Sequence, residues 1–334
     1  MTDKMGSQKP ASELRFDLVS KDWVVIATGR AKRPEVFIKQ ERVKNDKGEA
    51  ECPFCHLEES AKLLEYKNEK KEWEVAVILN KFPAFSHAET QHERAEGPYS
   101  LMDGVGFHEV VITRDHKKSL AEFTTEQVRR VIDAYQERYL ELANEKFVNY
   151  ISIFHNHGRE AGASMVHPHS QIIAIPLIDP DLSRSLNGSR LFFETQGECV
   201  HCQMLEWDLE DKQRVIYENK EFVVLSPFAS RVAFETRIYP KEHHAYFERI
   251  KDREKEQFAD ALRQAISRIF RGMNDPAYNF FIHTAPCDGK DYGHYHWHLE
   301  ILPKTSTWAG FELGAGIEIS VVKPEEAAKY LREI

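Results

Sequence analysis

The chain has no run of about twenty consecutive apolar residues, which a membrane-spanning helix requires. Its N-terminus, Met-Thr-Asp-Lys, also lacks the apolar core of a signal peptide. These two features predict a soluble, cytoplasmic protein with no membrane partner. An excess of positive charge is missing as well: 45 Lys and Arg against 54 Asp and Glu give a net charge of -9. This acidic balance disfavours nucleic acid as the main partner.

Cysteine is scarce, with five in 334 residues, yet four of them form two Cys-x-x-Cys pairs. The pairs are Cys52 with Cys55 and Cys199 with Cys202. In a chain without an export signal, such pairs more often bind metal or carry out redox chemistry than form structural disulfides. Redox pairs usually open a helix after a strand, and neither pair here follows a clear strand into a clear helical pattern. The sequence therefore predicts metal binding.

The order of motifs repeats along the chain. Each half reads Cys-x-x-Cys, a strand followed by His, an amphipathic helix, a strand, a glycine loop and His-x-His. The first of these helices begins at the capping box Thr124-x-x-Gln127. This repetition predicts an internal duplication, with a linker over residues 178–197. With 42% hydrophobic residues, the chain can form a core in each half.

The duplicated pattern offers one set of four metal ligands in each half. Structural zinc sites use four Cys and His ligands in a closed tetrahedron. The first set is Cys52, Cys55, His116 and His167, and the second is Cys199, Cys202, His243 and His296. The alternative is that the histidines are unrelated and each cysteine pair is simply buried, although chance would rarely supply the same order twice. The sequence predicts one or two structural zinc ions.

The run His167-Pro168-His169-Ser170-Gln171 leads into the apolar segment 172–176, which reads as a buried strand. If Pro168 lies where the strand begins, His167, His169 and Gln171 share one face, since strand residues two apart do so. With His167 bound to metal, His169 stays free as a nucleophile toward phosphorus. Gln171 and the backbone amides of the loop 158–164 can donate to phosphate oxygens. The arrangement fits nucleotidyl transfer through a histidine-bound intermediate.

Three cations fall within four residues of the turn that follows the first strand. They are Arg30, Lys32 and Arg33, with Ala31 between them. Cations next to glycine after a strand suit phosphate, and they equally suit a solvated turn. These residues alone leave both readings open.

From residue 15 to residue 334, the chain resembles the galactose-1-phosphate uridylyltransferase family of the histidine-triad superfamily. The resemblance rests on the turn at 30–34, on 80–84 and on 162–171. It implies that the turn binds the nucleotide phosphates. It also implies a duplicated half-barrel α/β fold of two antiparallel-sheet modules, each with a long helix. The modules span 12–178 and 196–334. It also implies ping-pong transfer through His169, release of glucose 1-phosphate, and a homodimer. The implied substrate-binding residues are Arg30, Ala31, Lys32, Arg33, Asn80, Lys81, Asn156, Gly162, Ala163, Ser164, Gln171, Phe311 and Glu312.

Two departures from the family pattern bear on the acceptor. Met165-Val166 stands where uridylyltransferases carry Asn-Pro. The run 306–312, which includes Phe311 and Glu312, lacks the lysine and the tyrosine that meet the hexose phosphate. The chain is therefore more similar to the ADP-glucose phosphorylases of this family, in which phosphate discharges an adenylylated histidine.

Other functions stay open at this point. One is uridylyl transfer from UDP-glucose to galactose 1-phosphate, within galactose metabolism, and another is hydrolysis, in which water discharges the adduct. A zinc-ribbon module for nucleic acid is disfavoured by the acidic balance and by ligand gaps of tens of residues. For the second metal, the family also implies a different set, a glutamate with three histidines, for which His283, His296 and His298 are candidates.

Overall fold

The structure is a computed structural model that describes residues 12–27, 37, 48–57, 60–88 and 91–334. Arg30, Ala31, Lys32 and Arg33 therefore lie outside the described residues. Within the described part, no helix is long and apolar enough to cross a membrane.

Fifteen strands and six α-helices make up the described chain. The strands are β1 (Glu13–Phe16), β2 (Trp23–Ile26), β3 (Lys62–Lys67), β4 (Trp73–Leu79), β5 (Glu93–Glu96), β6 (Tyr99–Met102), β7 (Phe107–Thr113), β8 (Tyr150–His157), β9 (His169–Ile175), β10 (Val215–Glu218), β11 (Phe222–Leu225), β12 (Thr236–Pro240), β13 (Tyr278–His283), β14 (His298–Pro303) and β15 (Ile319–Ser320). The helices are α1 (Thr125–Leu142), α2 (Pro180–Gln196), α3 (Val200–Asp211), α4 (Asp252–Met273), α5 (Gly310–Ala315) and α6 (Pro324–Glu333).

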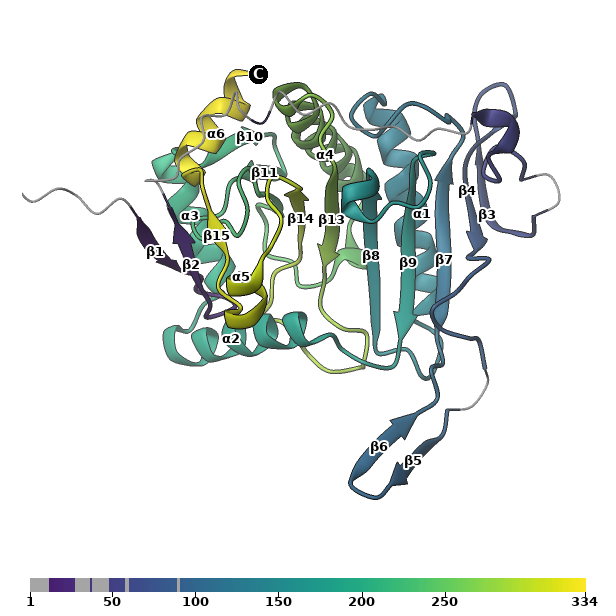
Figure 1. Cartoon of the computed structure of the whole chain (residues 1–334), viewed down its shortest axis with the longest axis horizontal. Helices are drawn as coiled ribbons and strands as arrows, with labels where there is room; N and C mark the ends of the chain where they lie inside the picture. The colour runs from purple at the N-terminus through teal and green to yellow at the C-terminus, as the bar shows by residue number, and fades with distance from the viewer. Residues whose placement is uncertain (1–11, 28–36, 38–47, 58–59, 89–90) are drawn as a thin grey trace, which may run out of the picture.

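Ten of these strands form one antiparallel sheet in the order β3-β4-β7-β9-β8-β13-β14-β12-β11-β10. The first five strands come from the first half of the chain and the last five from the second half. The halves meet where β8 pairs with β13, with Phe154 opposite Phe281 (Figure 1). The expected mixed α/β fold with antiparallel sheets is confirmed, and the two halves share a single sheet.

The two long helices, α1 and α4, pack on the same face of this sheet (Figure 1). On β9, Ile172 and Ala174 point to α1 and are fully buried in the core between helix and sheet. The same alternation turns His169 and Gln171 to the opposite face, because successive strand residues point to opposite sides. In the second half, Leu299 on β14 faces the helical core in the same way. The sheet thus has one apolar, helix-covered face and one face that carries the polar groups.

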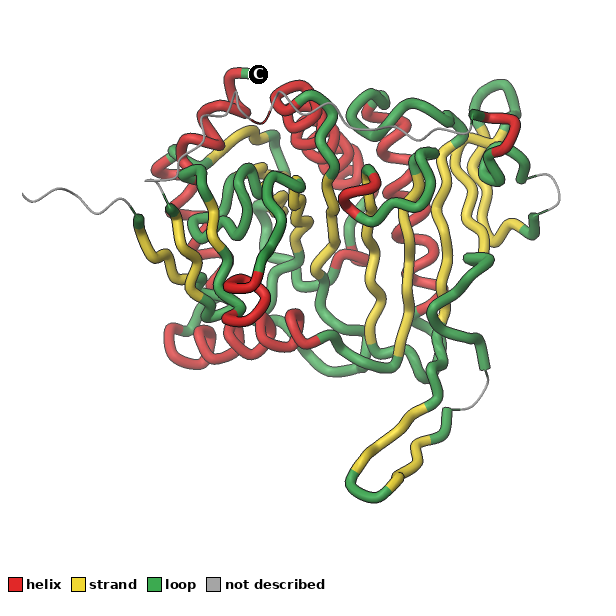
Figure 2. The backbone as a smooth tube through the Cα atoms, in the orientation of Figure 1, coloured by secondary structure: helices red, strands yellow, loops and turns green. Residues whose placement is uncertain are grey.

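The capping box at the start of α1 forms as predicted: the Gln127 N–H donates to Thr124 and the Thr124 N–H donates back to Gln127. Two other segments differ from the prediction. Residues 178–197 hold the helix α2 rather than a linker. Cys199 is the residue directly before α3, so the second Cys-x-x-Cys pair does lead into a helix. The polar stretch 86–104 contains the hairpin β5–β6, which extends away from the main body (Figure 2).

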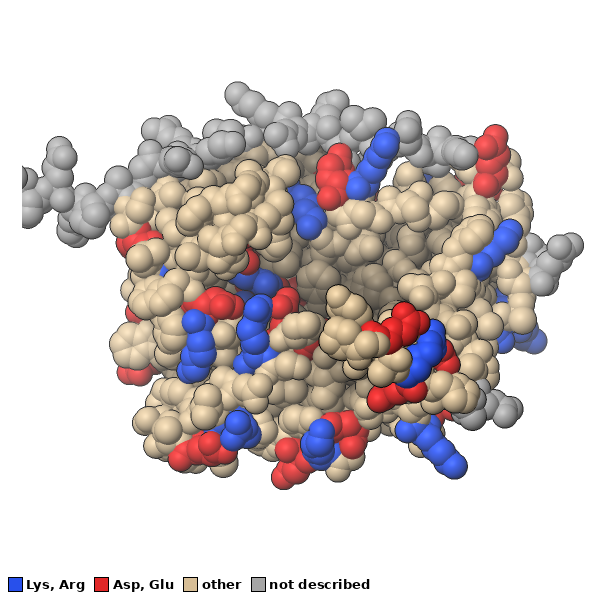
Figure 3. Space-filling view, turned by 60° about the horizontal axis from the view of Figure 1, so that its bottom comes forward, with Lys and Arg blue, Asp and Glu red and all other residues tan. Residues whose placement is uncertain are grey.

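Acidic and basic side chains are interspersed over the face that carries α2. Figure 3 shows them around a central recess whose walls are mostly uncharged. On this face the acidic side chains thus do not form one continuous area.

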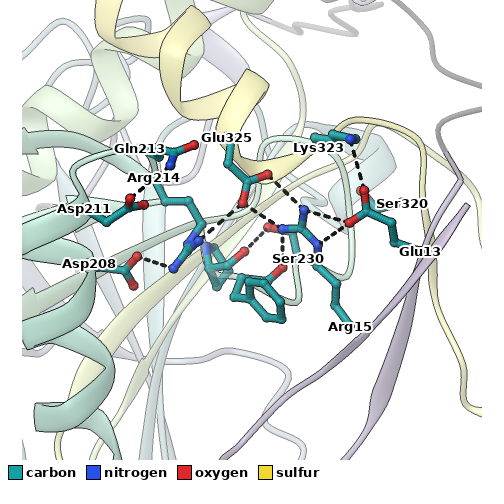
Figure 4. Close-up of polar contacts among 12 residues, drawn as sticks. Glu13, Arg15, Asp208, Asp211, Gln213, Arg214, Ser230, Ser320, Lys323 and Glu325 are labelled. Carbon is teal, nitrogen blue, oxygen red and sulfur yellow. Dashed lines mark hydrogen bonds and ion pairs between the residues drawn. The ribbon is translucent and has the colours of Figure 1, made fainter. Parts of the chain in front are cut away.

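A second sheet, β1-β2-β15, joins the two chain ends. Arg15 on β1 is buried and makes two hydrogen bonds of 2.9 and 3.1 Å to the carboxylate of Glu325 on α6 (Figure 4). The same carboxylate accepts a hydrogen bond of 3.3 Å from Arg214, whose guanidinium also pairs with Asp208 of α3 at 2.5 Å. Glu325 therefore bridges two buried guanidinium groups from distant parts of the sequence, and Glu13 and Asp208 supply a second carboxylate to Arg15 and Arg214, respectively.

We expect Glu325→Gln to lower the free energy of unfolding by about 3 kcal/mol, because it leaves buried cations partly uncompensated. Burial alone would raise the pKa of Glu325, but the hydrogen bond from Arg15 and the nearby guanidinium charges hold it below 4.5. Its contribution is therefore present above pH 4.5 and is lost as the pH falls through the lowered pKa. Urea unfolding at several pH values measures both effects. Glu333→Gln, an exposed change in the same helix, is the control; an equal loss in both variants would contradict the prediction.

Candidate active site and metal centres

His169 is the first residue of β9, directly after Pro168, as the sequence predicted. Its Nδ1 lies 2.9 Å from the carbonyl oxygen of His167. A carbonyl oxygen only accepts hydrogen bonds, so Nδ1 carries the proton and the lone pair of the ring resides on Nε2. Burial lowers the pKa of His169 below 6.5, although the His167 carbonyl works in the opposite direction. A neutral imidazole with an Nε2 lone pair is the form that can attack phosphorus.

The rings around His169 hold it in place. Phe54, from the middle of the first Cys-x-x-Cys pair, meets the His169 ring edge-on at 5.1 Å between ring centres and the His167 ring at 5.8 Å. On the other side of β9, Ser170 bonds to the hydroxyl of Tyr135 at 2.5 Å and to Nδ1 of His155 at 2.9 Å. These contacts fix the backbone of the strand at the residue after the nucleophile candidate.

Gln171 lies on the same face of β9 as His169. Its Oε1 is 2.7 Å from Nε2 of His108 on β7. His108 in turn contacts the loop after β4, where Asn80 Nδ2 is 3.0 Å from the same ring nitrogen. The structure thus joins Asn80 and Gln171 through a histidine that the sequence analysis did not single out. Lys81 and the neighbouring Phe82, which is 83% exposed, lie on the same loop.

The loop between β8 and β9 begins beside Asn156. Asn279 on β13 donates to Oδ1 of Asn156 at 2.7 Å and to the carbonyl of Ala161 at 2.8 Å, which leaves the amide nitrogen of Asn156 as a donor. Gly162 has a φ of +87°, and a Cβ there would point to that nitrogen at 4.0 Å. Any side chain at Gly162 is therefore strained. Ala163 and Ser164 follow in the same loop and are partly or fully exposed.

The first predicted ligand set comes together as one cluster. Nδ1 of His167 is 3.5 Å from each cysteine sulfur, Cys52 and Cys55, and 3.3 Å from Nδ1 of His116. His116 is 3.3 Å from Cys55. A tetrahedral zinc with its usual bond lengths separates N and S ligands by about 3.3 to 3.8 Å. These distances fit a single metal ion of that size with all four side chains as ligands.

The tautomer of His167 suits a ligand. Its Nε2 lies 2.6 Å from the carbonyl oxygen of Thr113, so Nε2 carries the proton and Nδ1 presents its lone pair to the cluster. Burial lowers the pKa of His167 to about 4, which keeps the imidazole neutral. The Cys/His cluster can therefore bind metal at neutral pH, with His167 shared between the cluster and the backbone contact to His169.

The second set, Cys199, Cys202, His243 and His296, also forms a cluster. Cys202 lies 3.2 Å from Nδ1 of His243 and 3.6 Å from Nδ1 of His296. The Nε2 atoms of the two histidines donate to the carbonyls of Gly293 and Pro240, at 2.9 and 3.0 Å. A hydrogen bond from Cys202 and contacts with both histidines lower the pKa of Cys199. The donors and spacing again fit zinc.

The alternative ligand set for the second metal, His283, His296 and His298, does not come together as one cluster. His283, His298 and Glu300 do lie within ligand distance of one another. However, Glu300 forms an ion pair of 3.1 Å with Arg237 and another with Arg231, and His296 points its Nδ1 to Cys202. His296 therefore belongs to the cysteine cluster in this structure.

Two predicted substrate residues lie elsewhere in the fold. Phe311 and Glu312 are on α5, which Figure 1 shows beside β15 and α2, away from β9. Phe311 is 54% exposed. Within the described residues, the chain thus unites His169, Gln171, Asn80 and Asn156 on one face of the sheet and places α5 over its other half.

Comparison with known proteins finds similar proteins over nearly the whole chain. Residues 3–178 match the family described as galactose-1-phosphate uridyl transferase, N-terminal domain. The chain is 35% identical to ADP-glucose phosphorylase from Arabidopsis thaliana, over 99% of this chain and 95% of that protein. It is 30% identical to the galactose-1-phosphate uridylyltransferase of Thermotoga maritima, over 96% of this chain and 98% of that protein.

Solved structures show the same likeness. The crystal structure of an ADP-glucose phosphorylase from Arabidopsis thaliana with bound ADP-glucose matches with a TM-score of 0.81 and 33% identity, over 97% of this chain and 99% of that one. Fold and relatives define a nucleotidyltransferase. The chain belongs to the galactose-1-phosphate uridylyltransferase family.

Proposed function

We propose that the protein is an ADP-glucose phosphorylase that works through an adenylylated His169. The observation that carries this proposal is the contact of 2.9 Å between Nδ1 of His169 and the His167 carbonyl, which leaves the Nε2 lone pair as the nucleophile. The likeness to the Arabidopsis thaliana phosphorylase, at 35% identity over nearly the whole chain, supports ADP-glucose as the substrate.

In the first step, Nε2 of His169 attacks the α-phosphorus of ADP-glucose. A P–N bond forms while the bond from that phosphorus to the bridging oxygen breaks, and glucose 1-phosphate leaves. The ring becomes a cation, and its Nδ1–H bond to the His167 carbonyl strengthens as this charge develops. In the second step, an oxygen of inorganic phosphate attacks the same phosphorus. The P–N bond breaks, ADP leaves, and His169 returns to its neutral form.

The remaining residues of the site bind and orient the substrate in this proposal. The amide nitrogens of Gln171 and Asn156 donate to phosphate oxygens, with backbone amides of Gly162, Ala163 and Ser164. Asn80 and Lys81 contact the nucleoside. Zinc in the two Cys/His clusters is structural, because four protein ligands leave no open position. It holds the chain around the site and takes no part in the transfer.

We further propose that the chain is a duplication of two modules, 12–178 and 196–334. Two copies of the chain associate as a homodimer. The strand order of the ten-stranded sheet, which reads alike from both ends, supports the duplication. Phe311 and Glu312 lie apart from His169 within one chain, so a contact of α5 with a hexose would be made in the site of a second copy. Arg30, Ala31, Lys32 and Arg33 are assigned to the nucleotide phosphates on resemblance alone.

The mass of the intact protein after brief incubation with ADP-glucose tests the proposed activity. We expect a gain of one AMP, removed within the next turnover when phosphate is added. Incubation with UDP-glucose is the parallel experiment. A gain of UMP alone, discharged by galactose 1-phosphate, would instead identify a uridylyltransferase, the activity of the Thermotoga maritima relative. An adduct that decays at the same rate with and without phosphate would indicate a hydrolase.

A further inference from the structure

His108 is a buried imidazole of β7 for which the proposed reaction has no role so far. It is 8% exposed and belongs to the strand next to β9, where Val110 pairs with Gln171 and His108 with Ile173. Paired residues of an antiparallel sheet project to the same side. His108 is therefore a diagonal neighbour of Gln171 on the face that carries His169.

The protonation of the His108 ring follows from a backbone contact. The N–H of Ala84 donates to Nδ1 of His108 at 3.2 Å. The direction of a backbone N–H is fixed by the chain, whereas side-chain amides can turn over. Nδ1 is thus the acceptor, and the proton of the neutral ring resides on Nε2. This Nε2–H faces Oε1 of Gln171 at 2.7 Å, a strong hydrogen bond by its length.

The orientation of the Gln171 amide is settled by that donor. Its oxygen turns to His108, so its NH2 group points away from β7 and keeps both hydrogens for another acceptor. Asn80 does not compete for the proton, because its Oδ1 already accepts from the N–H of Phe82 at 2.9 Å and its amide nitrogen, 3.0 Å from Nε2, is itself a donor. His108 thus fixes the orientation of the Gln171 amide through this one hydrogen bond.

We propose that His108 is a positioning residue that acts through Gln171. By donating to Oε1 it holds the NH2 group of Gln171 toward the oxygens of the α-phosphate. Without it, the amide of Gln171 can rotate and present its oxygen, which repels the phosphate. This role rests on the proposed function, since it concerns the donor that stabilises charge during transfer to His169.

A double-mutant cycle between His108 and Gln171 tests this role. The variants are His108→Leu, Gln171→Ala and the two combined, and the measured quantity is the single-turnover rate of adduct formation at saturating ADP-glucose. We expect His108→Leu to slow adduct formation by about 10- to 100-fold, as for other residues that orient a ligand's partner. In the Gln171→Ala background the same change should slow it by no more than about 2-fold, because nothing is left to orient. Effects that multiply in the combined variant would overturn the proposal.

Two conservative variants separate orientation from packing. His108→Gln retains an amide N–H that can donate to Oε1, so it should recover part of the rate lost in His108→Leu. Gln171→Glu keeps an oxygen facing His108 but replaces the NH2 donor with a second oxygen, so it should be as slow as Gln171→Ala. A His108→Gln enzyme as slow as His108→Leu, or a Gln171→Glu enzyme as fast as wild type, would contradict the role of His108.

Misfolding and failure of the proposed function are distinguishable in the same experiment. Zinc content and thermal unfolding report whether each variant is folded, and we expect both to match wild type. A wild-type chain that forms no adduct with either nucleotide sugar would overturn the proposed function, and the role of His108 with it. An adduct in the wild type together with independent effects of the two residues would overturn the role of His108 alone.

Discussion

We expect His169→Gln to abolish the covalent adduct and to reduce turnover of ADP-glucose by at least about 10⁴-fold, because the variant lacks the nucleophile. The ring is the only part of the residue that offers a lone pair to phosphorus, and glutamine offers none at that position. Binding of ADP-glucose should weaken far less, because the amides of Gln171, Asn156 and the loop at 162–164 stay in place. The measurements are incorporation of labelled AMP and the dissociation constant of ADP-glucose from calorimetry.

His298→Gln is the matched control for this experiment. His298 begins β14 as His169 begins β9, is equally buried, and points its Nδ1 at the carbonyl of His296 at 3.2 Å. The residue two positions on is Glu300, whose carboxylate is held by Arg231 and Arg237, so the position that matches Gln171 supplies no amide donor. We therefore expect His298→Gln to form the adduct at the wild-type rate. Incorporation of labelled AMP into His169→Gln would show that His169 is not the nucleophile. Loss of the label in both variants would contradict a role that belongs to His169 alone.

Much of this site could be predicted from the sequence because its signals are local. The alternation around Pro168 indicated which side chains share a face, and the structure begins β9 at His169. The repeated Cys-x-x-Cys and His-x-His motifs predicted which side chains would come together, and both sets lie within ligand distance. His108 could not be found in this way. Its importance comes from pairing between β7 and β9, which are more than fifty residues apart in sequence.

The helix α2 shows how a local signal can mislead. The linker predicted over 178–197 contains Asp179-Pro180 and Asn187-Gly188, dipeptides that often mark turns. Asp179 instead caps the helix, accepting from the N–H of Leu182 at 2.9 Å, and Pro180 occupies the first helical turn, where its missing N–H costs nothing. Gly188 lies inside the helix. Only glycine fits at this position, because a Cβ there would be 1.9 Å from the carbonyl oxygen of Val19. The glycine serves close packing with a segment that is distant in sequence, and this the sequence alone does not indicate.

The first Cys/His cluster is linked directly to His169, the proposed nucleophile. His167 presents Nδ1 to the cluster, while its own carbonyl accepts the proton of His169 Nδ1 at 2.9 Å. Phe54, held between the two ligands Cys52 and Cys55, packs against the His169 ring. Loss of the ion would free the loop that carries Phe54 and the backbone of His167 together. Both contacts that orient His169 therefore depend on the same four ligands.

Cys55→Ser should consequently lose one zinc ion per chain and slow adduct formation by at least about 100-fold, as expected when the supporting shell of a site is lost. Structural zinc contributes about 10–16 kcal/mol of apparent binding energy to the folded state, so local unfolding around residues 48–57 should follow, seen as faster amide hydrogen exchange. Cys202→Ser is the matched variant in the second cluster. It should also lose one zinc ion and some stability, yet its ligands contact neither His169 nor the His167 carbonyl, so adduct formation should stay within about 3-fold of wild type. An equal loss of rate in both variants would show that zinc supports only the global fold, whereas a selective loss in Cys55→Ser would tie the first centre to the orientation of His169.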